Sequence, residues 1–420
     1  MHKYQECVQW ARRHRNNPIP VSGLAGLKAL YQEIEDAWSN APLGLASPTK
    51  VDHATWTPGK HYATMVPADV REYITAAGAG PEPYHWEWRW KAEGGREWRI
   101  CGWVPAALPP DLDAMWTKMV AWFRFLDRRA PVACSRRITV YLYLTPLTKT
   151  LPRQGTGQGT GQGTEGTEGT ELSESHVNSA FTQSCQASNE IYIFREEEWW
   201  KVLMHECIHA LGLDFSWYPR SDALLVPQIQ QVFPGVHSDH WAVTECWTET
   251  WAEILVLLFQ IREFVGPQAA WSRVAALLQR GVMYETAWSQ VQCIKVLDHY
   301  DVTYAELLAG ATYRETKTAV FSYYVLRCLI MTHLPAFLAW NADRGGFWTV
   351  FSKGRDKGQD KGWNQAQVRD HILALGEFLV AAAQDARTRR VLSERGERVE
   401  QSGHELRMSL WGGEINLNIV

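Results

Sequence analysis

Two histidines and a glutamate in the segment KVLMHECIHALGLD (201–214) have the spacing of a metal-binding site. His205 and His209 are four residues apart, and Glu206 follows the first histidine directly. Positions i and i+4 lie on one face of an α-helix, so both imidazoles can bind a single ion. Glu206 would then lie beside a water on that ion and could act as a general base. The spacing predicts a zinc site that cleaves bonds; an ordinary helix that carries these residues is the competing interpretation.

A catalytic zinc ion is held by three protein ligands and keeps a fourth position for water, so the two histidines require a third partner. One option lies directly downstream, where the chain partly matches the metzincin pattern HExxHxxGxxH. Gly212 matches its glycine, but Phe215 stands where the third histidine should be, and Asp214 is one residue out of register. This departure disfavours a metzincin ligand set.

The second option is the segment ECWTETWAE, in which Glu245, Glu249 and Glu253 recur every four residues. They share one face of a long helix predicted for residues 238–264. If that face met solvent, the repulsion within each pair would cost only a few tenths of a kcal/mol. Apolar residues flank the acids, however, and burying unpaired carboxylates costs far more. A cation opposite this face is therefore the better explanation.

The HExxH segment together with TETWAE (248–253) resembles the gluzincin branch of zinc metallopeptidases. In that family the HExxH helix is paired with a second helix that carries a glutamate ligand. The longer run from VNSAFT to TETWAE (177–253) is also similar to HExxH proteins of large nucleocytoplasmic DNA viruses. The resemblance says little about residues 1–130 or 270–420.

The gluzincin resemblance implies a role for each acid of the second helix. Glu249 would be the third zinc ligand, and Glu253 would steady a ligating histidine from behind. Thr248 stands where the family often has asparagine. Glu245 and Asp214 are the alternatives for the third ligand.

The implied reaction is hydrolysis of a peptide bond, with Zn²⁺ as cofactor and a peptide or protein as substrate. Zinc would activate a water, and Glu206 would take its proton and pass it to the leaving amine. The extended segment 177–182 is a candidate edge strand for pairing with the substrate backbone. The developing oxyanion needs a donor. The candidates for this donor are Tyr218, His237, His240, His299 and Tyr300.

The predicted elements place these residues in an α+β fold that is mostly helical, with a small mixed sheet. A helix is expected over 111–130, and strands are expected over 136–145 and 189–194. The segment 196–212 is expected to form the HExxH helix, which ends at Gly212 as the residue that follows its last turn. The stretch 51–110 is expected to be irregular. The resulting regions are 1–130, helical and Trp-rich; 131–265, a zincin-like core with a disordered Gly-Thr loop at 153–171; and 266–420, helical and without a functional motif.

Composition excludes several classes of partner. The formal net charge of −4 comes from 42 basic and 46 acidic residues, too balanced to indicate a nucleic acid or a membrane surface. The apolar stretch 321–340 is interrupted by Arg327, His333 and Pro335, which predicts a buried helix with a Pro-broken continuation. Eight cysteines without a CxxC pair, and an N-terminus without a secretory signal, predict reduced thiols in the cytoplasm or nucleus.

Two further functions compete with a metallopeptidase. The chain could be a catalytically silent interaction module that uses its Trp-rich N-terminal half, although most of the 22 tryptophans are expected to supply core area. It could also be another zinc hydrolase, such as a deacylase, because such enzymes also use a water activated by the metal. Retention of Glu206 argues against the silent module. The sequence leaves the oligomeric state open.

Overall fold

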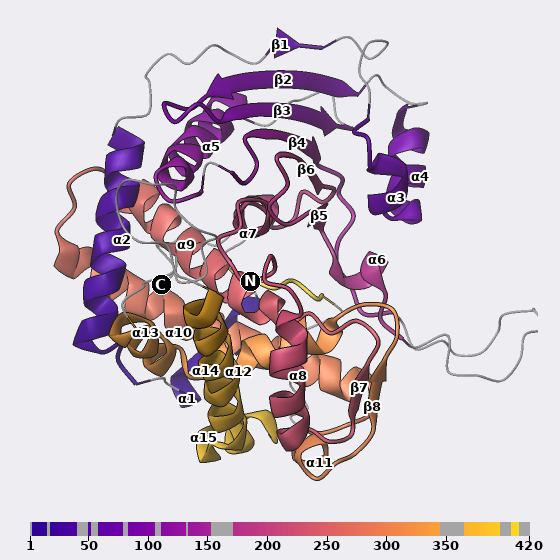
Figure 1. The fold of residues 1–420 in the computed structure, drawn as a ribbon, viewed down its shortest axis with the longest axis vertical. Helices are drawn as coiled ribbons and strands as arrows, with labels where there is room; N and C mark the ends of the chain where they lie inside the picture. Colours follow the sequence, from indigo (N-terminus) through magenta and orange to yellow (C-terminus); the bar gives the residue numbers. More distant parts are fainter. Residues whose placement is uncertain are drawn as a thin grey trace, which may run out of the picture.

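The structure, a computed structural model, has an α+β fold in which one mixed sheet packs against a larger helical body (Figure 1). It describes residues 2–14, 17–39, 49–51, 58–78, 83–105, 111–131, 133–152, 171–344, 365–394 and 405–410. The strands are β1 (Thr49–Lys50), β2 (Tyr84–Lys91), β3 (Glu97–Val104), β4 (Arg137–Tyr143), β5 (Ala180–Thr182), β6 (Ser188–Ile193), β7 (Val236–Ser238) and β8 (Tyr313–Glu315). The helices up to the HExxH helix are α1 (His2–Arg13), α2 (Val21–Ser39), α3 (Tyr62–Met65), α4 (Ala68–Gly78), α5 (Leu112–Asp127), α6 (Glu174–Val177) and α7 (Trp199–Ala210). Those that follow are α8 (Ser221–Val232), α9 (Thr244–Val265), α10 (Trp271–His299), α11 (Tyr304–Leu308), the π-helix η2 (Phe321–Leu326), α12 (Arg327–Thr332), α13 (Leu334–Asp343), α14 (Gln365–Gln384) and α15 (Ala386–Leu392).

The main sheet has the strand order β1-β2-β3-β4-β6-β5. β3, β4 and β6 run parallel to one another, whereas β2 and β5 are antiparallel to their neighbours. β5 therefore forms one edge of the sheet, as expected for the segment 177–182. The predicted strands 136–145 and 189–194 are confirmed as β4 and β6.

Tryptophans fill one face of this sheet. Trp88 of β2 stacks on Trp116 of α5, and Trp98 of β3 stacks on Phe123 of the same helix. Every tryptophan in the described part of the chain is buried or half-buried, which confirms that these residues supply core area. The strands 84–91 and 97–104 thus offer no exposed aromatic platform.

The other face of the sheet carries a smaller core formed with α3 and α4. Tyr141, Tyr143 and Tyr192 from β4 and β6 pack there against Val66 and Val70. Gly102 of β3 has no room for a side chain, because an added Cβ would lie 2.0 Å from the Trp86 ring.

The HExxH helix α7 lies beneath β5 and β6 and packs along α9 (Figure 1). Gly212 follows α7 with φ of +62°, which confirms its predicted place past the helix end. α9 begins at Thr244, later than predicted, because residues 236–238 form strand β7 instead. α9 in turn contacts α10, η2 and α12 in the helical body.

The stretch 321–340 folds as η2 and α12, followed by α13 after an 80° bend. His333 stands at the break, and Pro335 lies in the first turn of α13. Among the described helices none alone is long and apolar enough to span a membrane, although this bent pair passes the same test by length and composition.

Three sequence predictions need correction or limits. Residues 51–110 are not irregular throughout, because β2 and β3 form a complete antiparallel pair. Strands from both sides of the boundary predicted at 130/131 also share one sheet, since β3 pairs with β4. The loop 153–171 lies outside the described residues except for its last position.

The cysteines also differ from expectation at one place. Cys134 and Cys185 form a disulfide, whereas reduced thiols were predicted throughout. The pair lies against Gly212, and the backbone N–H of Cys185 donates to the carbonyl of His209. The other six cysteines are free and buried.

Residues 405–410 are held inside the helical body by hydrogen bonds to buried groups. The Tyr324 hydroxyl donates to the carbonyl of Leu406 at 2.8 Å. The Ser409 hydroxyl and the Leu410 N–H both donate to Glu285, at 2.7 and 3.0 Å. Residues far apart in sequence thereby complete one core.

Arg327 joins this segment to α9. Its guanidinium is fully buried, pairs with Glu253 (Nε to Oε2, 3.1 Å) and also donates to the carbonyl of Met408. Removing the cation would leave Glu253 buried with the Glu285 carboxyl group beside it and no positive charge from Arg327.

We expect Arg327→Met to lower the free energy of unfolding by about 3–5 kcal/mol, because breaking a buried pair strands the remaining charge. Arg369→Met is the matched control, since the Arg369 side chain is 53% exposed and lies 4.0 Å from Asp370. That change should cost no more than about 0.5 kcal/mol. Urea unfolding monitored by tryptophan fluorescence measures both. Equal midpoints for the two variants would contradict the role given to Arg327.

Candidate metal centre

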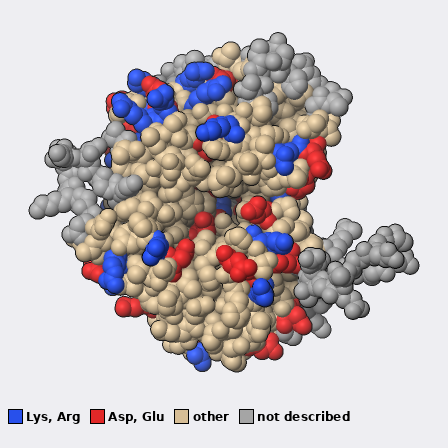
Figure 2. All heavy atoms as spheres, turned by 45° about the vertical axis from the view of Figure 1, so that its right-hand side comes forward, with Lys and Arg blue, Asp and Glu red and all other residues tan. Residues whose placement is uncertain are grey.

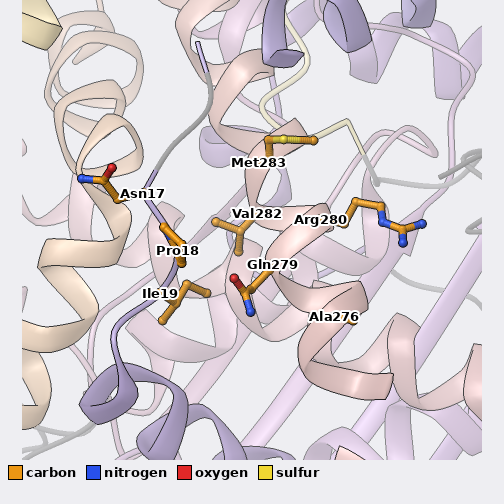
Figure 3. Close-up of a pocket in the computed structure, with 8 residues that line it drawn as sticks. All are labelled: Asn17, Pro18, Ile19, Ala276, Gln279, Arg280, Val282 and Met283. Carbon is orange, nitrogen blue, oxygen red and sulfur yellow. The ribbon is translucent and has the colours of Figure 1, made fainter. Parts of the chain in front are cut away.

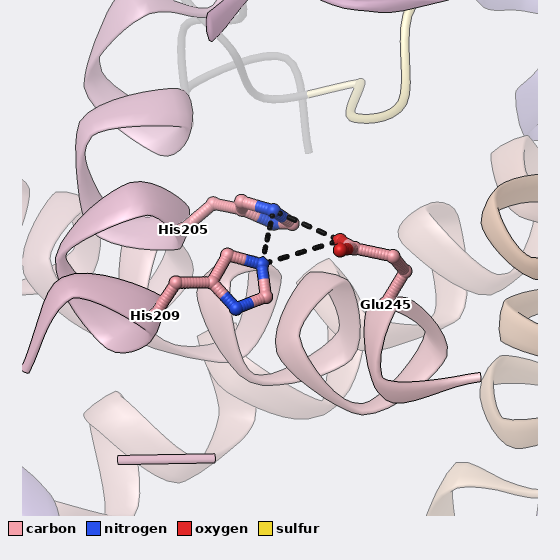
Figure 4. A group of neighbouring side chains, drawn as sticks. All are labelled: His205, His209 and Glu245. Carbon is pink, nitrogen blue, oxygen red and sulfur yellow. Dashed lines mark hydrogen bonds and ion pairs between the residues drawn. The ribbon is translucent and has the colours of Figure 1, made fainter. Parts of the chain in front are cut away.

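The three predicted residues of the HExxH motif lie together on α7. His205 and His209 project from one face of the helix, and their Nε2 atoms are 3.0 Å apart (Figure 4). Glu206 is buried beside them, with Oε1 4.0 Å from Nε2 of His205. The helix thus brings both imidazoles to a single point, as the i, i+4 spacing predicts.

The acid that meets this point is Glu245, from the first turn of α9. Its Oε2 lies 3.1 Å from Nε2 of His205 and 3.3 Å from Nε2 of His209 (Figure 4). Ligands 2.0–2.1 Å from a tetrahedral zinc ion are about 3.3–3.4 Å from one another. The three atoms therefore have nearly the spacing of three tetrahedral ligands, and the residues fit a zinc ion.

A further carboxylate lies behind each histidine. Nδ1 of His205 is 3.2 Å from Oε1 of Glu249, and Nδ1 of His209 is paired with Oδ2 of Asp214. Metal-binding histidines commonly donate their second ring N–H to a carboxylate, which fixes the ring with its other nitrogen toward the ion. The buried Asp214 faces the His209 ring in this way, and the buried Glu249 lies at ion-pair distance from Nδ1 of His205.

Asp214 is itself fixed by its surroundings. The N–H and hydroxyl of Ser216 donate to Oδ1 at 3.0 and 2.6 Å, and the hydroxyl of Thr248 on α9 donates to Oδ2 at 2.9 Å. The left-handed turn at Gly212 aims this loop back at the helix that it has just left. The loop therefore ties α7 to α9 at the level of His209.

Glu249 has a second cation as partner, Lys201, which lies one turn before His205 on α7. Burial alone would raise the pKa of Glu249, but Lys201 and His205 outweigh it and hold the pKa well below its usual range. The Glu249 carboxylate is therefore charged when it faces the His205 ring.

Attraction between the histidines and the nearby carboxylates shifts the pKa values of His205, His209 and Glu245. Burial alone would lower the pKa of His205, yet Glu249 and Glu245 raise it to about 9. Burial likewise opposes the charge of His209, but Glu245 and Asp214 raise its pKa well above the usual value. The pKa of Glu245 falls to about 2 because the two histidines outweigh its burial.

Glu206 has the opposite electrostatic character. Burial raises its pKa to about 7, although His205 and His209 pull it down. A carboxyl group with a pKa near neutrality can both accept and return a proton. Glu206 also lines a cavity next to His205, so a substrate there would be within its reach.

The cavity lies between the sheet edge and the helical body. Its walls come from α7, from residues 177–180 ahead of and in β5, and from Glu249 of α9. Two side chains from the C-terminal region complete it, Tyr323 of η2 and Met408 of the segment 405–410. Figure 2 shows this side of the molecule hollowed near its centre, with basic and acidic side chains at the floor.

A second pocket lies between residues 17–19 and α10 (Figure 3). Ile19 and Met283 give it an apolar lining, and Arg280 is the single charged side chain among its described residues. Because none of these described residues is a carboxylate, histidine or cysteine, they offer no group for acid–base or metal chemistry.

Comparison of the chain with models of known protein families, with curated proteins and with solved structures finds no match. The geometry of the site is the basis of the functional proposal below.

The acids that meet the histidines lie one helical turn earlier on α9 than predicted. Glu245, instead of Glu249, lies within reach of both Nε2 atoms, and Glu249, instead of Glu253, lies behind a histidine. Glu253 itself pairs with Arg327, away from the histidines. The sequence could not fix this register, because acids four residues apart occupy equivalent positions on the helix face.

The cavity also changes the candidates for an oxyanion donor. None of the five predicted donors is among its lining residues, whereas Tyr323 is. Burial raises the pKa of Tyr323 well above its usual range, reinforced by Glu245 and Glu206, so its hydroxyl keeps its proton. π-helices occur frequently at functional sites, but the sequence FSYYVL gives no sign of one.

We expect metal affinity to rise by at least tenfold per pH unit between pH 6.5 and 9. The raised pKa values mean that a metal must displace protons from His205 and His209, which becomes easier as pH rises. The pKa of His205 is higher in the folded chain than in the unfolded chain, so protonation of His205 stabilises the metal-free fold. This stabilisation is complete below about pH 6.5 and disappears as the pH passes 9. Competition with a chromogenic zinc chelator over this range measures the slope, and a flat profile would disprove the expectation.

Proposed function

We propose that this chain is a zinc-dependent metallopeptidase. The observation that supports it most is the convergence of His205, His209 and Glu245 at tetrahedral spacing, with Glu206 beside them in a cavity. Such a ligand set leaves one zinc position open, which is the mark of a catalytic rather than a structural site. The gluzincin resemblance implies the same kind of ligand set, two histidines and a glutamate, but with Glu249 in place of Glu245.

The proposed reaction assigns one task to each residue. Zinc, when bound, would supply Lewis-acid activation of a water. Glu206 removes the proton of the attacking water and delivers it to the leaving amine, for which its pKa of about 7 is suited. Tyr323 donates its O–H to the carbonyl oxygen as negative charge develops there. Glu249 and Asp214 keep both imidazoles oriented throughout.

The edge strand β5 favours a peptide as substrate. β5 pairs with β6 on one side only and ends the sheet, and residues 178–180 line the cavity. An extended peptide can add to such an edge through main-chain hydrogen bonds, which would lay a peptide bond across the site. A deacylase would share the metal and Glu206 but would not need this edge.

The silent interaction module has less support. Its Trp-rich surface is occupied by core packing, and Glu206 keeps the burial and position of a general base. Location in the cytoplasm or nucleus remains part of the proposal; the six free cysteines agree with it, whereas the Cys134–Cys185 disulfide does not.

We expect Glu245→Gln to abolish stoichiometric zinc binding, because an amide is a poor substitute for a ligating carboxylate. Glu249→Gln should keep the metal with an affinity about 10–100-fold lower, the usual effect of changing a group behind a ligand. Glu263→Gln, on the exposed part of the same helix, is the control. Zinc is counted by elemental analysis after gel filtration without chelator. Wild-type protein without zinc would refute the ligand assignment. Loss of zinc from Glu249→Gln but not from Glu245→Gln would also refute it.

We expect Glu206→Gln to retain zinc and lose at least about a hundredfold in peptide hydrolysis, the typical contribution of a general base. Tyr323→Phe should lower kcat by about a hundredfold with little change in KM, because its hydrogen bond forms in the transition state. Tyr218→Phe serves as the control, since Tyr218 does not line the cavity. Hydrolysis of fluorogenic peptides measures the activity of both variants, and elemental analysis measures their zinc content in parallel. Full activity in Glu206→Gln would end the peptidase proposal.

A further inference from the structure

One wall of the cavity carries a hydroxyl group that no described residue contacts by a hydrogen bond. Ser179 precedes β5, is only 5% exposed and lines the cavity, yet its Oγ has no hydrogen-bond partner within the described part of the chain. Leaving a buried hydroxyl unsatisfied costs roughly 1–3 kcal/mol. A polar group of a bound molecule would satisfy it.

Two lysines line the same cavity. Lys149 and Lys201 are 2% and 1% exposed, which is rare for lysine. Lys149 pairs with Glu198 at 2.6 Å, and Lys201 pairs with Glu249. An ammonium group has three N–H donors, and within the described residues each of these has one carboxylate partner. These acids balance the two charges, and each ammonium group has more N–H donors than a single carboxylate oxygen accepts.

These donors lie close to the proposed reaction centre. Lys201 is four residues before His205 on α7, which is about 6 Å along the helix axis. One residue of an extended peptide spans about 3.3–3.6 Å. A group held at Lys201 would therefore belong to a residue one or two positions from the cleaved bond.

The serine hydroxyl can donate or accept, whereas the two ammonium groups only donate, so this wall suits a group that accepts several hydrogen bonds at once, such as a carboxylate, although Glu206 and Glu249 line other parts of the cavity. We infer that the Ser179–Lys149–Lys201 wall binds a substrate carboxylate next to the cleaved bond, and so selects acidic peptides. The carboxylate can come from an aspartate or glutamate side chain or from a free C-terminus. This inference rests on the proposed peptidase function and specifies its substrate class.

The first test uses wild-type protein and an unbiased peptide library, with Glu206→Gln as the blank that reveals contaminating proteases. Cleaved sites should be enriched in aspartate or glutamate, or should lie near free C-termini. The best peptide is then compared in four forms, with glutamate or glutamine at that position and with a free or amidated C-terminus. The form with the recognised carboxylate should have kcat/KM at least about tenfold higher, as expected for a charge-assisted hydrogen bond. Equal values for all four forms would overturn the inference and leave the peptidase proposal intact.

Ser179→Ala tests the wall without endangering the fold, because its hydroxyl has no partner to lose. It should reduce the preference for the carboxylate peptide by about tenfold while leaving the amide forms unchanged. Ser188→Ala, at the exposed start of β6, is the matched control. A Ser179→Ala protein that weakens all four peptides equally would indicate a structural role instead.

A binding measurement decides the inference even if no peptide is cleaved. Calorimetry compares glutarate with glutaramide, which lacks the carboxylates, on wild type and on Ser179→Ala. Glutarate should bind wild type more tightly, and the difference should shrink in Ser179→Ala. Absence of Glu206-dependent cleavage together with selective glutarate binding would reject the peptidase proposal but keep the carboxylate site. Absence of selective binding and of selective cleavage would reject the site.

Discussion

Carboxylates on one face of α9 are the constraint around which the helical body is organised. Glu249 and Glu253 are buried and Glu245 is half-buried beside the histidines, and an unpaired buried charge costs several kcal/mol. Each acid therefore needs a cation, and each finds it on another element. The histidines of α7 face the first, Lys201 faces the second, and Arg327 of α12 faces the third. The same pairing that stabilises α9 also fixes the angle at which α7 presents its two imidazoles.

Local spacing predicted the arrangement of the α7 side chains. HExxH gives the relative positions of His205, Glu206 and His209 from helix geometry alone, and these are the positions that the structure shows. The strands β4 and β6 were also evident from their β-branched and aromatic residues. Both results depend on neighbours close in sequence, which is where pattern analysis is strongest.

The parts that pattern analysis missed depend on longer distances or on competing signals. Choosing Glu245 over Glu249 requires the crossing of α7 and α9, and nothing in a four-residue repeat specifies that. Tyr323 reaches the cavity through a π-helix more than a hundred residues after the motif. By contrast, β2 and β3 could have been found, because WEWRW alternates apolar and charged residues with the period of a strand. The many tryptophans and glycines around them suggested irregular structure instead.

The cavity cannot be completed before the segment 405–410 has been synthesised. Glu198, at the start of α7, accepts the backbone N–H groups of Met408 and Ser409, and Met408 forms part of the cavity wall. During synthesis the histidines leave the ribosome some 200 residues before these partners. A nascent chain that already contains the whole motif still lacks one wall of the cavity and two donors to the Glu198 carboxylate. Completion of the cleft is thereby delayed until residues 405–410 have been synthesised.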